Sequence, residues 1–393
     1  MSTSTLPSEF SSNSSNSSNS NSSMVPQRLL WAASVTLPFL FTQLVLQTKV
    51  VAPGELISNL VDDASMSMYI HKDSFNGTTL NAPVCGNISA EEVDFTLAIH
   101  LSRKRLGLMA GHCRRWAGHP ISVAVGTPNT TRWTRKLLTS LGCSKKYVKL
   151  QTVMFVEGNE SYPVNKLRNM ALEGVNTSHA ILLDADFLPS KDLYDNLILH
   201  RQRLTNPKKA IVIPAFDSNI SSVLRIPDNK KGLLNAFGYP GRWRHGRNKL
   251  VREFAFDYRV NQGGHSSTDY KKWLYQKNET KLAPITCLKS PRYEPYLAFR
   301  YCQDLPPFQE QFSGYGQNKI TWMLHFRRAG YKLYQLGPAF VVHVQHFMSP
   351  DKLKWVGIRK AGNKAPVEQT SKEFRYWLNN FVPDQTMVPD CQA

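Results

Sequence analysis

The chain has 393 residues, of which 41% are hydrophobic and 11% aromatic, and this composition indicates a globular protein of one large or two small domains. Lysine and arginine outnumber aspartate and glutamate by 48 to 29, which gives a formal net charge of +19 and favours anionic partners. The basic residues are spread over 100–360 without an RNA-binding or zinc-finger pattern, so the sequence disfavours a nucleic-acid binder.

The amino-terminal end predicts a tail followed by a membrane anchor. Residues 1–23 are dominated by Ser, Asn and Thr and should form a disordered cytoplasmic tail, because they cannot bury a core. Within residues 24–52, the uncharged apolar run 29–46 would rise about 27 Å as a helix, just enough to cross a bilayer. We therefore predict a signal anchor, with Arg28 on its cytoplasmic side. The alternative is a cleaved signal peptide, although the run starts late and no small-x-small site follows it.

The residues after this run favour the secretory pathway. Residues 53–92 are polar and lack periodicity, which predicts a stem. We expect a single-pass type II protein of the Golgi membrane whose lumenal body carries glycans and permits disulfides. The cysteine count is even, no CxxC pair suggests zinc, and the connectivity stays open. Seven sequons follow the run: Asn76, Asn87, Asn129, Asn159, Asn176, Asn219 and Asn278.

Strand-like and helix-like segments alternate from Val93 onwards. Strands are predicted over 95–101, 121–125, 147–156, 180–183 and 210–213. Helices are predicted over 102–116 and 165–172, and after Ser190 as an N-cap. This alternation predicts a mixed, mostly parallel central sheet flanked by helices, an α/β fold.

Two carboxylates follow the most apolar of these strands. The run Ala180–Leu183 reads as a strand buried on both faces, and Asp184 and Asp186 come directly after it. Open α/β sheets bind ligands at the carboxyl ends of their strands. Two acidic side chains there are costly to leave unpaired, and a divalent cation with hard oxygen ligands is their natural partner. A cation that also binds a diphosphate suits a nucleotide-sugar.

The second half is less regular. Residues 217–290 are rich in Gly, Lys, Arg and Asn, and their length without pattern indicates a functional loop, for which acceptor binding is a plausible use. Strands are predicted again over 296–299 and 339–342, and helices over 319–328 and 371–381.

Seven segments, in order, resemble glycosyltransferase family 49, which includes the glucuronyltransferase half of the LARGE-type enzymes and the β-1,4-glucuronyltransferase. The resemblance runs from about Val93 to Phe381 and implies a GT-A nucleotide-sugar-binding domain over 93–382, with a tail over 383–393. The segments are YPVNKLRN (162–169), ILLDADFLPS (181–190), KKAIVIPAFD (208–217), GHSSTDYKKW (264–273), YEPYLAFR (293–300), FSGYGQNKI (312–320) and PAFVVHVQH (338–346).

The resemblance implies a metal site and a donor site. Asp184 and Asp186 match the family's acidic pair, and His343 matches the histidine that completes its metal site, with His346 as a weaker candidate. Carboxylates plus imidazole suit Mn²⁺, with Mg²⁺ as the alternative. The residues implied at the UDP-sugar donor are Asn165, Arg168, Asp184, Asp186, Asn318 and Lys319.

Inversion at the sugar requires a carboxylate that takes a proton from the acceptor hydroxyl. The family places a Glu amid aromatics at Glu294, which is the first candidate base. Asp217 is the second, although the family usually has Glu there. The candidate acceptor-binding residues are His265, Trp273 and Tyr293, together with Trp243.

The sequence therefore predicts an inverting, metal-dependent glycosyltransferase that moves glucuronate from UDP-glucuronate to a glycan or glycoprotein acceptor. UDP-N-acetylglucosamine and UDP-xylose stay open as donors, as does the oligomeric state. A non-catalytic glycan-binding or scaffolding relative is the alternative class, and the intact Asp184, Asp186 and His343 argue against it.

Overall fold

The computed structural model describes residues 65–218, 220–237, 251–252, 264–276, 281–363 and 365–392. The predicted tail, the predicted anchor, Trp243, and the sequons at Asn219 and Asn278 lie outside the described residues. Among the residues that are described, no helix combines the length and apolar character that a bilayer crossing requires.

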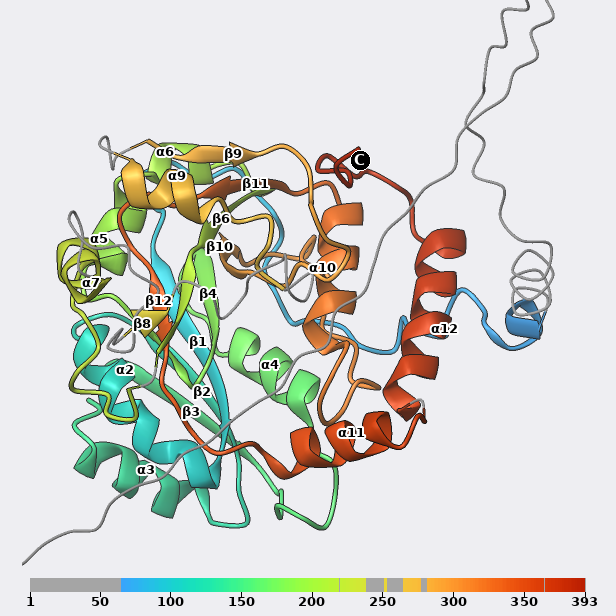
Figure 1. Cartoon of the computed structure of the whole chain (residues 1–393), viewed down its shortest axis with the longest axis horizontal. Helices are drawn as coiled ribbons and strands as arrows, with labels where there is room; N and C mark the ends of the chain where they lie inside the picture. The colour runs from blue at the N-terminus through green and yellow to red at the C-terminus, as the bar shows by residue number, and fades with distance from the viewer. Residues whose placement is uncertain are drawn as a thin grey trace, which may run out of the picture. The chain divides into compact units, whose positions relative to one another are not determined.

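A mixed eight-stranded sheet forms the centre of the described chain, in the order β3-β2-β1-β4-β10-β6-β11-β9 (Figure 1). The first four strands in this order run parallel, β10 runs antiparallel to both β4 and β6, and β11 returns parallel to β6. The prediction of an α/β fold around a mixed sheet is confirmed. The strands are β1 (Phe95–Ser102), β2 (Ile121–Gly126), β3 (Val148–Val153), β4 (His179–Asp184), β6 (Lys209–Ile213), β9 (Ala283–Ile285), β10 (Tyr296–Arg300) and β11 (Lys332–Gln335).

A second, smaller sheet was not predicted. Its order is β5-β12-β7-β8, formed by β5 (Phe187–Pro189), β7 (Ala215–Ser218), β8 (Val251–Arg252) and β12 (Val341–His343). Strand β5 of this sheet begins immediately after Asp186, and strand β12 ends at His343. Because β5 and β12 pair, the small sheet brings the acidic pair and the histidine of the predicted metal site together. His343 is the last residue of β12 rather than the residue after it.

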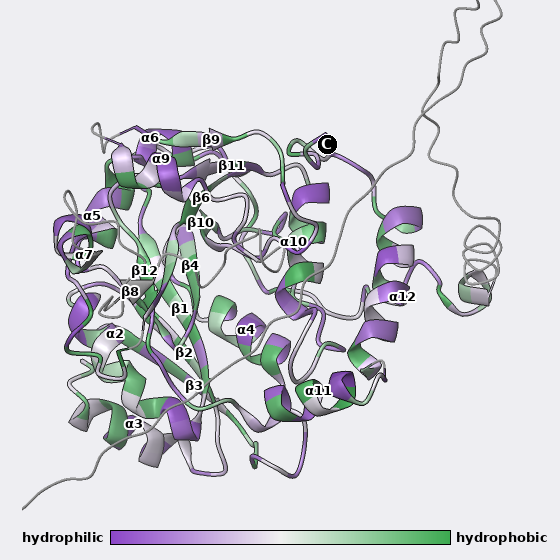
Figure 2. Ribbon diagram, viewed as in Figure 1, coloured by the Kyte–Doolittle hydropathy of each residue, from purple (hydrophilic) through white to green (hydrophobic). Residues whose placement is uncertain are grey.

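The central strands are mostly apolar and buried on both faces, and Figure 2 shows the hydrophobic stretches of β1 and β4. Ile181 and Leu183 join one core cluster with residues of α2, α3 and α5, whereas Ala180 and Leu182 join another with residues of α4 and α10. The helical elements are η1 (Arg103–Leu108), α2 (Met109–Arg115), α3 (Thr131–Ser140), α4 (Val164–Glu173), α5 (Leu193–Ile198), α6 (Arg201–Leu204), α7 (Lys230–Phe237), α9 (Tyr270–Tyr275), α10 (Asn318–Arg328), α11 (Pro350–Lys360) and α12 (Pro366–Phe381).

The predicted N-cap at Ser190 is wrong. Ser190 is fully buried, and its hydroxyl accepts a hydrogen bond from the backbone N–H of Phe340 at 3.3 Å. That hydroxyl therefore joins the end of β5 to the segment before β12, and α5 begins later, at Leu193 after Asp192.

Both ends of the described chain pack against the domain. Phe75, in the predicted stem, is buried against Phe374 and Trp377 of α12, so part of 53–92 belongs to the globular body. Val388, in the predicted tail, is buried as well. Three disulfides use all six cysteines: Cys85–Cys302 and Cys287–Cys391 tie these ends to the domain, and Cys113–Cys143 joins α2 to the segment after α3.

Buried histidines predict a loss of stability in mild acid. Five histidines are buried in the described part of the chain, and burial lowers the pKa of each. The pKa falls to about 4 for His112 and to about 3 for His179. Unfolded histidines bind a proton below about pH 6.5, whereas folded His112 and His179 stay neutral until the pH approaches 4, so stability is complete above pH 6.5 and falls as the pH drops towards 4. These two histidines should each add about 1.4 kcal/mol per pH unit to the slope.

Urea unfolding measured between about pH 7 and pH 4.5 checks this expectation. His179→Gln should reduce the slope, because His179 then no longer contributes a proton difference. An unfolding free energy that stays constant over this interval would contradict the prediction.

Candidate functional site

The site lies at the carboxyl end of β4, as predicted. Asp184 is the last residue of β4, Ala185 turns the chain, and Asp186 precedes β5. On one side β4 pairs in parallel with β1, with His100 opposite Asp184, and on its other side it pairs antiparallel with β10. The two carboxylates consequently face side chains from several strands and helices, and they have different partners.

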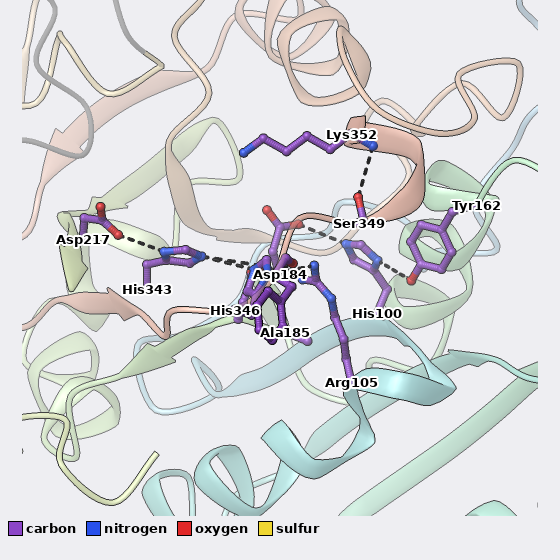
Figure 3. A network of polar contacts seen from close by, with 12 residues as sticks. His100, Arg105, Tyr162, Asp184, Ala185, Asp217, His343, His346, Ser349 and Lys352 are labelled. Carbon is purple, nitrogen blue, oxygen red and sulfur yellow. Dashed lines mark hydrogen bonds and ion pairs between the residues drawn. The ribbon is translucent and has the colours of Figure 1, made fainter. Parts of the chain in front are cut away.

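Asp184 is the centre of a dense polar network, part of which Figure 3 shows. Its Oδ1 accepts from Arg168 Nη2 at 3.0 Å and lies 3.0 Å from His100 Nε2. Its Oδ2 accepts from Tyr296 Oη and Lys319 Nζ, each at 2.9 Å. Burial alone would raise the pKa of Asp184, but Lys319, Arg168 and His100 outweigh it and hold that pKa well below its usual range. Asp184 is therefore a fixed anion that organises two cations.

The predicted donor-binding residues converge on this network. Arg168 Nη1 donates to Asn165 Oδ1 at 2.9 Å and to Asn318 Oδ1 at 2.8 Å. Asn318 and Lys319 begin α10, which follows a loop in which Gly314, Gly316 and Gln317 all have positive φ. Glycine adopts that conformation without strain, and this explains why the Gly-x-Gly spacing precedes the helix.

Removing the charge of Asp184 should destabilise the fold. Asp184→Asn leaves the Arg168 and Lys319 side chains, 4% and 16% exposed, without their shared anion. A broken buried ion pair costs about 3–5 kcal/mol, and we expect a urea unfolding free energy lower by that amount. The control is Asp304→Asn, whose half-exposed carboxylate pairs with Lys208 and should contribute about 1 kcal/mol or less. Equal effects of the two substitutions would show that the network contributes no buried pairing.

Asp186 belongs to a separate cluster with two histidines. Its Oδ2 lies 2.6 Å from His346 Nε2 and 3.8 Å from His343 Nε2, and the two Nε2 atoms lie 3.3 Å apart. Arg105 Nη1 also donates to this Oδ2 at 2.6 Å. Burial would raise the pKa of Asp186, but His346 and Arg105 outweigh it and lower that pKa to about 2.

The cluster fits a transition-metal ion. Asp186, His343 and His346 each offer a ligand atom, and these atoms all lie within 4.8 Å of one another. Asp186 Oδ1 is buried and has no hydrogen-bond partner, so one hard oxygen donor is available for coordination. One carboxylate and two imidazoles form a donor set that suits Mn²⁺ better than Mg²⁺, which prefers oxygen ligands.

The predicted metal trio of Asp184, Asp186 and His343 is not the group that the structure brings together. Asp184 is absent from the cluster because its two oxygens are engaged by cations, an imidazole and a phenol, and His346 takes its place. The segment after β12 accounts for the exchange: Val344 N–H donates to the carbonyl of Asp186 at 2.7 Å, and His346, two residues further on, lies against the Asp186 carboxylate.

Sequence reasoning missed three residues around the acidic turn. His112 is fully buried, and its Nε2 lies 2.9 Å from the carbonyl of Ala185, between the two aspartates. Arg105 contacts Asp186, and His100 bridges Asp184 and Tyr162. Residues 100–105 span the end of β1 and the start of η1. Because β1 and β4 run parallel, their carboxyl ends lie at the same edge of the sheet, and this pairing was the signal that could have identified His100 and Arg105.

The two candidate bases have different surroundings. Glu294 lines one cavity with Asp184 and Lys319. Burial raises the pKa of Glu294, Lys319 opposes this rise, and Asp184 adds to it. Its backbone N–H donates to Gly264 O at 2.7 Å, and a Cβ on Gly264 would come within 2.6 Å of Glu294 Cγ. Asp217, in contrast, lies against His343.

The predicted acceptor-binding residues are core residues. Trp273 is fully buried against Phe216, and Tyr293 is 1% exposed with its hydroxyl 3.0 Å from Thr268 Oγ1. His265 is 2% exposed beside Tyr296. Aromatic residues fill a core as readily as they line a sugar site, and the side chains of Trp273 and Tyr293 are buried in the structure.

A buried mixed sheet that ends in paired aspartates, with arginine, lysine and histidines around them, is typical of enzymes that handle phosphorylated or nucleotide-linked substrates. The family described as "Glycosyl-transferase for dystroglycan" matches residues 129–373, and the chain belongs to this family of glycosyltransferases.

Its relatives are longer proteins. The chain is 32% identical over 290 residues to "Xylosyl- and glucuronyltransferase LARGE2s" of Gallus gallus, covering 73% of this chain and 36% of that protein. It is 30% identical over 271 residues to "Xylosyl- and glucuronyltransferase LARGE1" of Homo sapiens, covering 68% and 33%. The chain thus spans about a third of the length of the curated relatives it matches. Likeness to solved structures is weaker: "Crystal structure of GalNAc-T7 with UDP, GalNAc and Mn2+" has a TM-score of 0.41 at 13% identity, covering 84% of this chain and 65% of that chain.

Proposed function

We propose that this chain is an inverting glycosyltransferase that moves a sugar, glucuronate by preference, from a UDP-sugar to a glycan or glycoprotein acceptor, on a GT-A type domain. The observation that carries the proposal is the pair of adjacent polar centres at the end of β4. The first centre combines one carboxylate and two imidazoles, a donor set that suits a metal ion. The second is Asp184, whose carboxylate accepts hydrogen bonds from Arg168 and Lys319.

The donor side of the proposal rests on Arg168 and Lys319. Both are held by Asp184 beside the metal-type cluster, where their charges suit a diphosphate and an acidic sugar through charge-assisted hydrogen bonds. The two relatives described above are named xylosyl- and glucuronyltransferases, which supports both UDP-glucuronate and UDP-xylose, and the cationic side chains favour the acidic sugar of UDP-glucuronate. UDP-xylose and UDP-N-acetylglucosamine are the competing donors.

Asp186, His343 and His346 would hold Mn²⁺ in this proposal, with Mg²⁺ as the alternative ion. A metal ion bound there supplies positive charge for the diphosphate leaving group, as a Lewis acid. The chain's own part is to fix the ligands: β12 presents His343, the segment after it presents His346, and β5 fixes the backbone that follows Asp186.

Glu294 is the proposed general base. Its carboxylate takes the proton of the acceptor hydroxyl while that oxygen bonds to C1 of the sugar and the bond from C1 to the UDP oxygen breaks, which inverts C1. Asp184 and Lys319 line the same cavity as Glu294, so the base and one of the donor-side cations face one space. A non-catalytic glycan-binding relative would need neither this base nor the metal-type cluster.

The proposed location is the Golgi membrane, with one amino-terminal anchor and a lumenal catalytic domain. Three disulfides among the described residues fit an oxidising compartment. Of the five sequons in the described part, Asn76, Asn87, Asn159 and Asn176 are exposed, as glycosylation requires. Protease treatment of intact vesicles should leave 53–393 protected, and cleavage there would reverse the topology.

UDP release from a panel of UDP-sugars, with and without manganese, tests the function. We expect manganese-dependent release with UDP-glucuronate among the preferred donors. Release that is indifferent to a chelator would remove the metal from the proposal, and absence of release from every donor, with glycan binding intact, would favour the non-catalytic alternative.

A further inference from the structure

Two strands of the small sheet bring Asp217 and His343 together. Strands β7 and β12 run parallel, with Ala215 opposite Val341 and Phe216 opposite Val342. Asp217 and His343 come next on their strands, and their side chains meet: Asp217 Oδ1 lies 2.9 Å from His343 Nδ1. The contact follows from strand register rather than from a flexible loop, so the sheet itself holds the pair in place.

The chemistry of this contact selects one form of the imidazole. An ionised carboxylate can only accept a hydrogen bond, so the proton of neutral His343 lies on Nδ1. Its Nε2 then carries a lone pair, and this atom lies 3.3 Å from His346 Nε2 and 3.8 Å from Asp186 Oδ2. Neutral imidazole with a free ring nitrogen is the form that binds metals.

The backbone around His343 is fixed as well. Ser218 Oγ donates to the carbonyl of His343 at 2.6 Å, and β5 pairs Phe187 with His343 from the other side. The strands on both sides thus set where His343 lies, while Asp217 sets which nitrogen of its ring faces the cluster.

We propose that Asp217 is a positioning residue that orients His343 and fixes its tautomer for metal binding. The proposal rests on the metal site of the proposed function and gives Asp217 a role other than general base. In Figure 3, Asp217 lies at the edge of the network, with the ring of His343 between it and the other cluster residues. Its Oδ1 is engaged by His343. A base must instead reach the acceptor hydroxyl directly.

Manganese binding measured by isothermal titration calorimetry on the chelator-treated protein tests the role without any need for turnover. Removing a carboxylate that orients a ligating histidine weakens metal binding by about 10–100-fold. We expect that loss in Asp217→Asn, whose amide can donate to Nδ1 and favour the wrong tautomer, and in Asp217→Ala. Asp217→Glu keeps the anionic acceptor and should recover at least part of the affinity.

The matched control is Asp304→Asn, which removes the same charge from an exposed ion pair with Lys208 and should leave manganese affinity within about twofold of wild type. Melting temperatures recorded in chelator verify that the variants fold. In UDP-release assays, Asp217→Asn should need more manganese yet keep most of its kcat once manganese saturates.

Three results overturn the proposal or part of it. Wild-type manganese affinity in Asp217→Asn overturns it and leaves the transferase function standing. A kcat that stays lost at saturating manganese, with normal metal affinity, returns Asp217 to the role of base. A wild-type protein that binds no manganese but releases UDP in chelator overturns both the metal site and this inference, without touching the transfer reaction.

Discussion

Asp186→Ala should reduce UDP release by about a thousandfold or more, because a metal at the leaving group supplies several kcal/mol of charge stabilisation and each 1.36 kcal/mol is a factor of ten. Asp186 is the one carboxylate of the cluster, and its Oδ1 is the donor that no hydrogen bond occupies. Alanine at this position leaves only His343 and His346, a ligand set too small to hold manganese firmly. The measurement is UDP release in a manganese series with UDP-glucuronate, together with calorimetric manganese binding.

The fold should tolerate this substitution. Arg105, which loses its carboxylate partner, is 29% exposed and can be solvated. Asp304→Ala removes an equivalent charge at the surface and should keep wild-type release. If Asp186→Ala retained manganese-dependent release within about tenfold of wild type, the metal would have to bind elsewhere.

The sequence alone predicts the same loss in Asp186→Ala, but it assigns Asp184, Asp186 and His343 to the metal, whereas the structure groups Asp186 with His343 and His346. The sequence located the acidic pair correctly, since an apolar strand that stops at a carboxylate marks the edge of a buried sheet. It treated Asp184 and Asp186 as equivalent. Their difference arises from Arg168 and Lys319, which reach Asp184 from α4 and α10, and from His346, which folds back on Asp186. Those are tertiary contacts between distant segments, and residue spacing cannot report them.

Some secondary-structure elements could not be recognised from the sequence because their local patterns are weak. Strands β5 and β7 are three and four residues long, too short for hydrophobic periodicity to be recognised. Helix α11 has no fully buried residue, so burial does not single it out, although Ser349 caps it and Pro350 starts it. Helix start signals were therefore the better guide there. The sequence also could not report burial: Trp273 was predicted to bind the acceptor, and the structure buries its side chain in the core.

Glu294→Gln should lower sugar transfer by about 10²–10⁴-fold, the usual contribution of a general base. Glutamine has the size of glutamate, so the backbone hydrogen bond to Gly264 and the packing against this glycine are kept while the proton acceptor is lost. UDP binding should stay near the wild-type value, since Lys319 and Arg168 keep their bonds to Asp184. Glu91→Gln, on an exposed turn, is the control.

The pH profile gives this base a second signature. Burial raises the pKa of Glu294, with Asp184 adding to the rise and Lys319 opposing it, so the ionised form that accepts the proton is lost at a pH above the ordinary glutamate value of about 4.5. The acidic limb of kcat/KM should therefore fall at a higher pH than an exposed glutamate would give. Transfer that persists in Glu294→Gln, together with transfer lost in Asp217→Asn at saturating manganese, would move the base to Asp217. Because Asp217 is engaged with His343 and Glu294 lines the cavity beside Lys319, the geometry favours the opposite result.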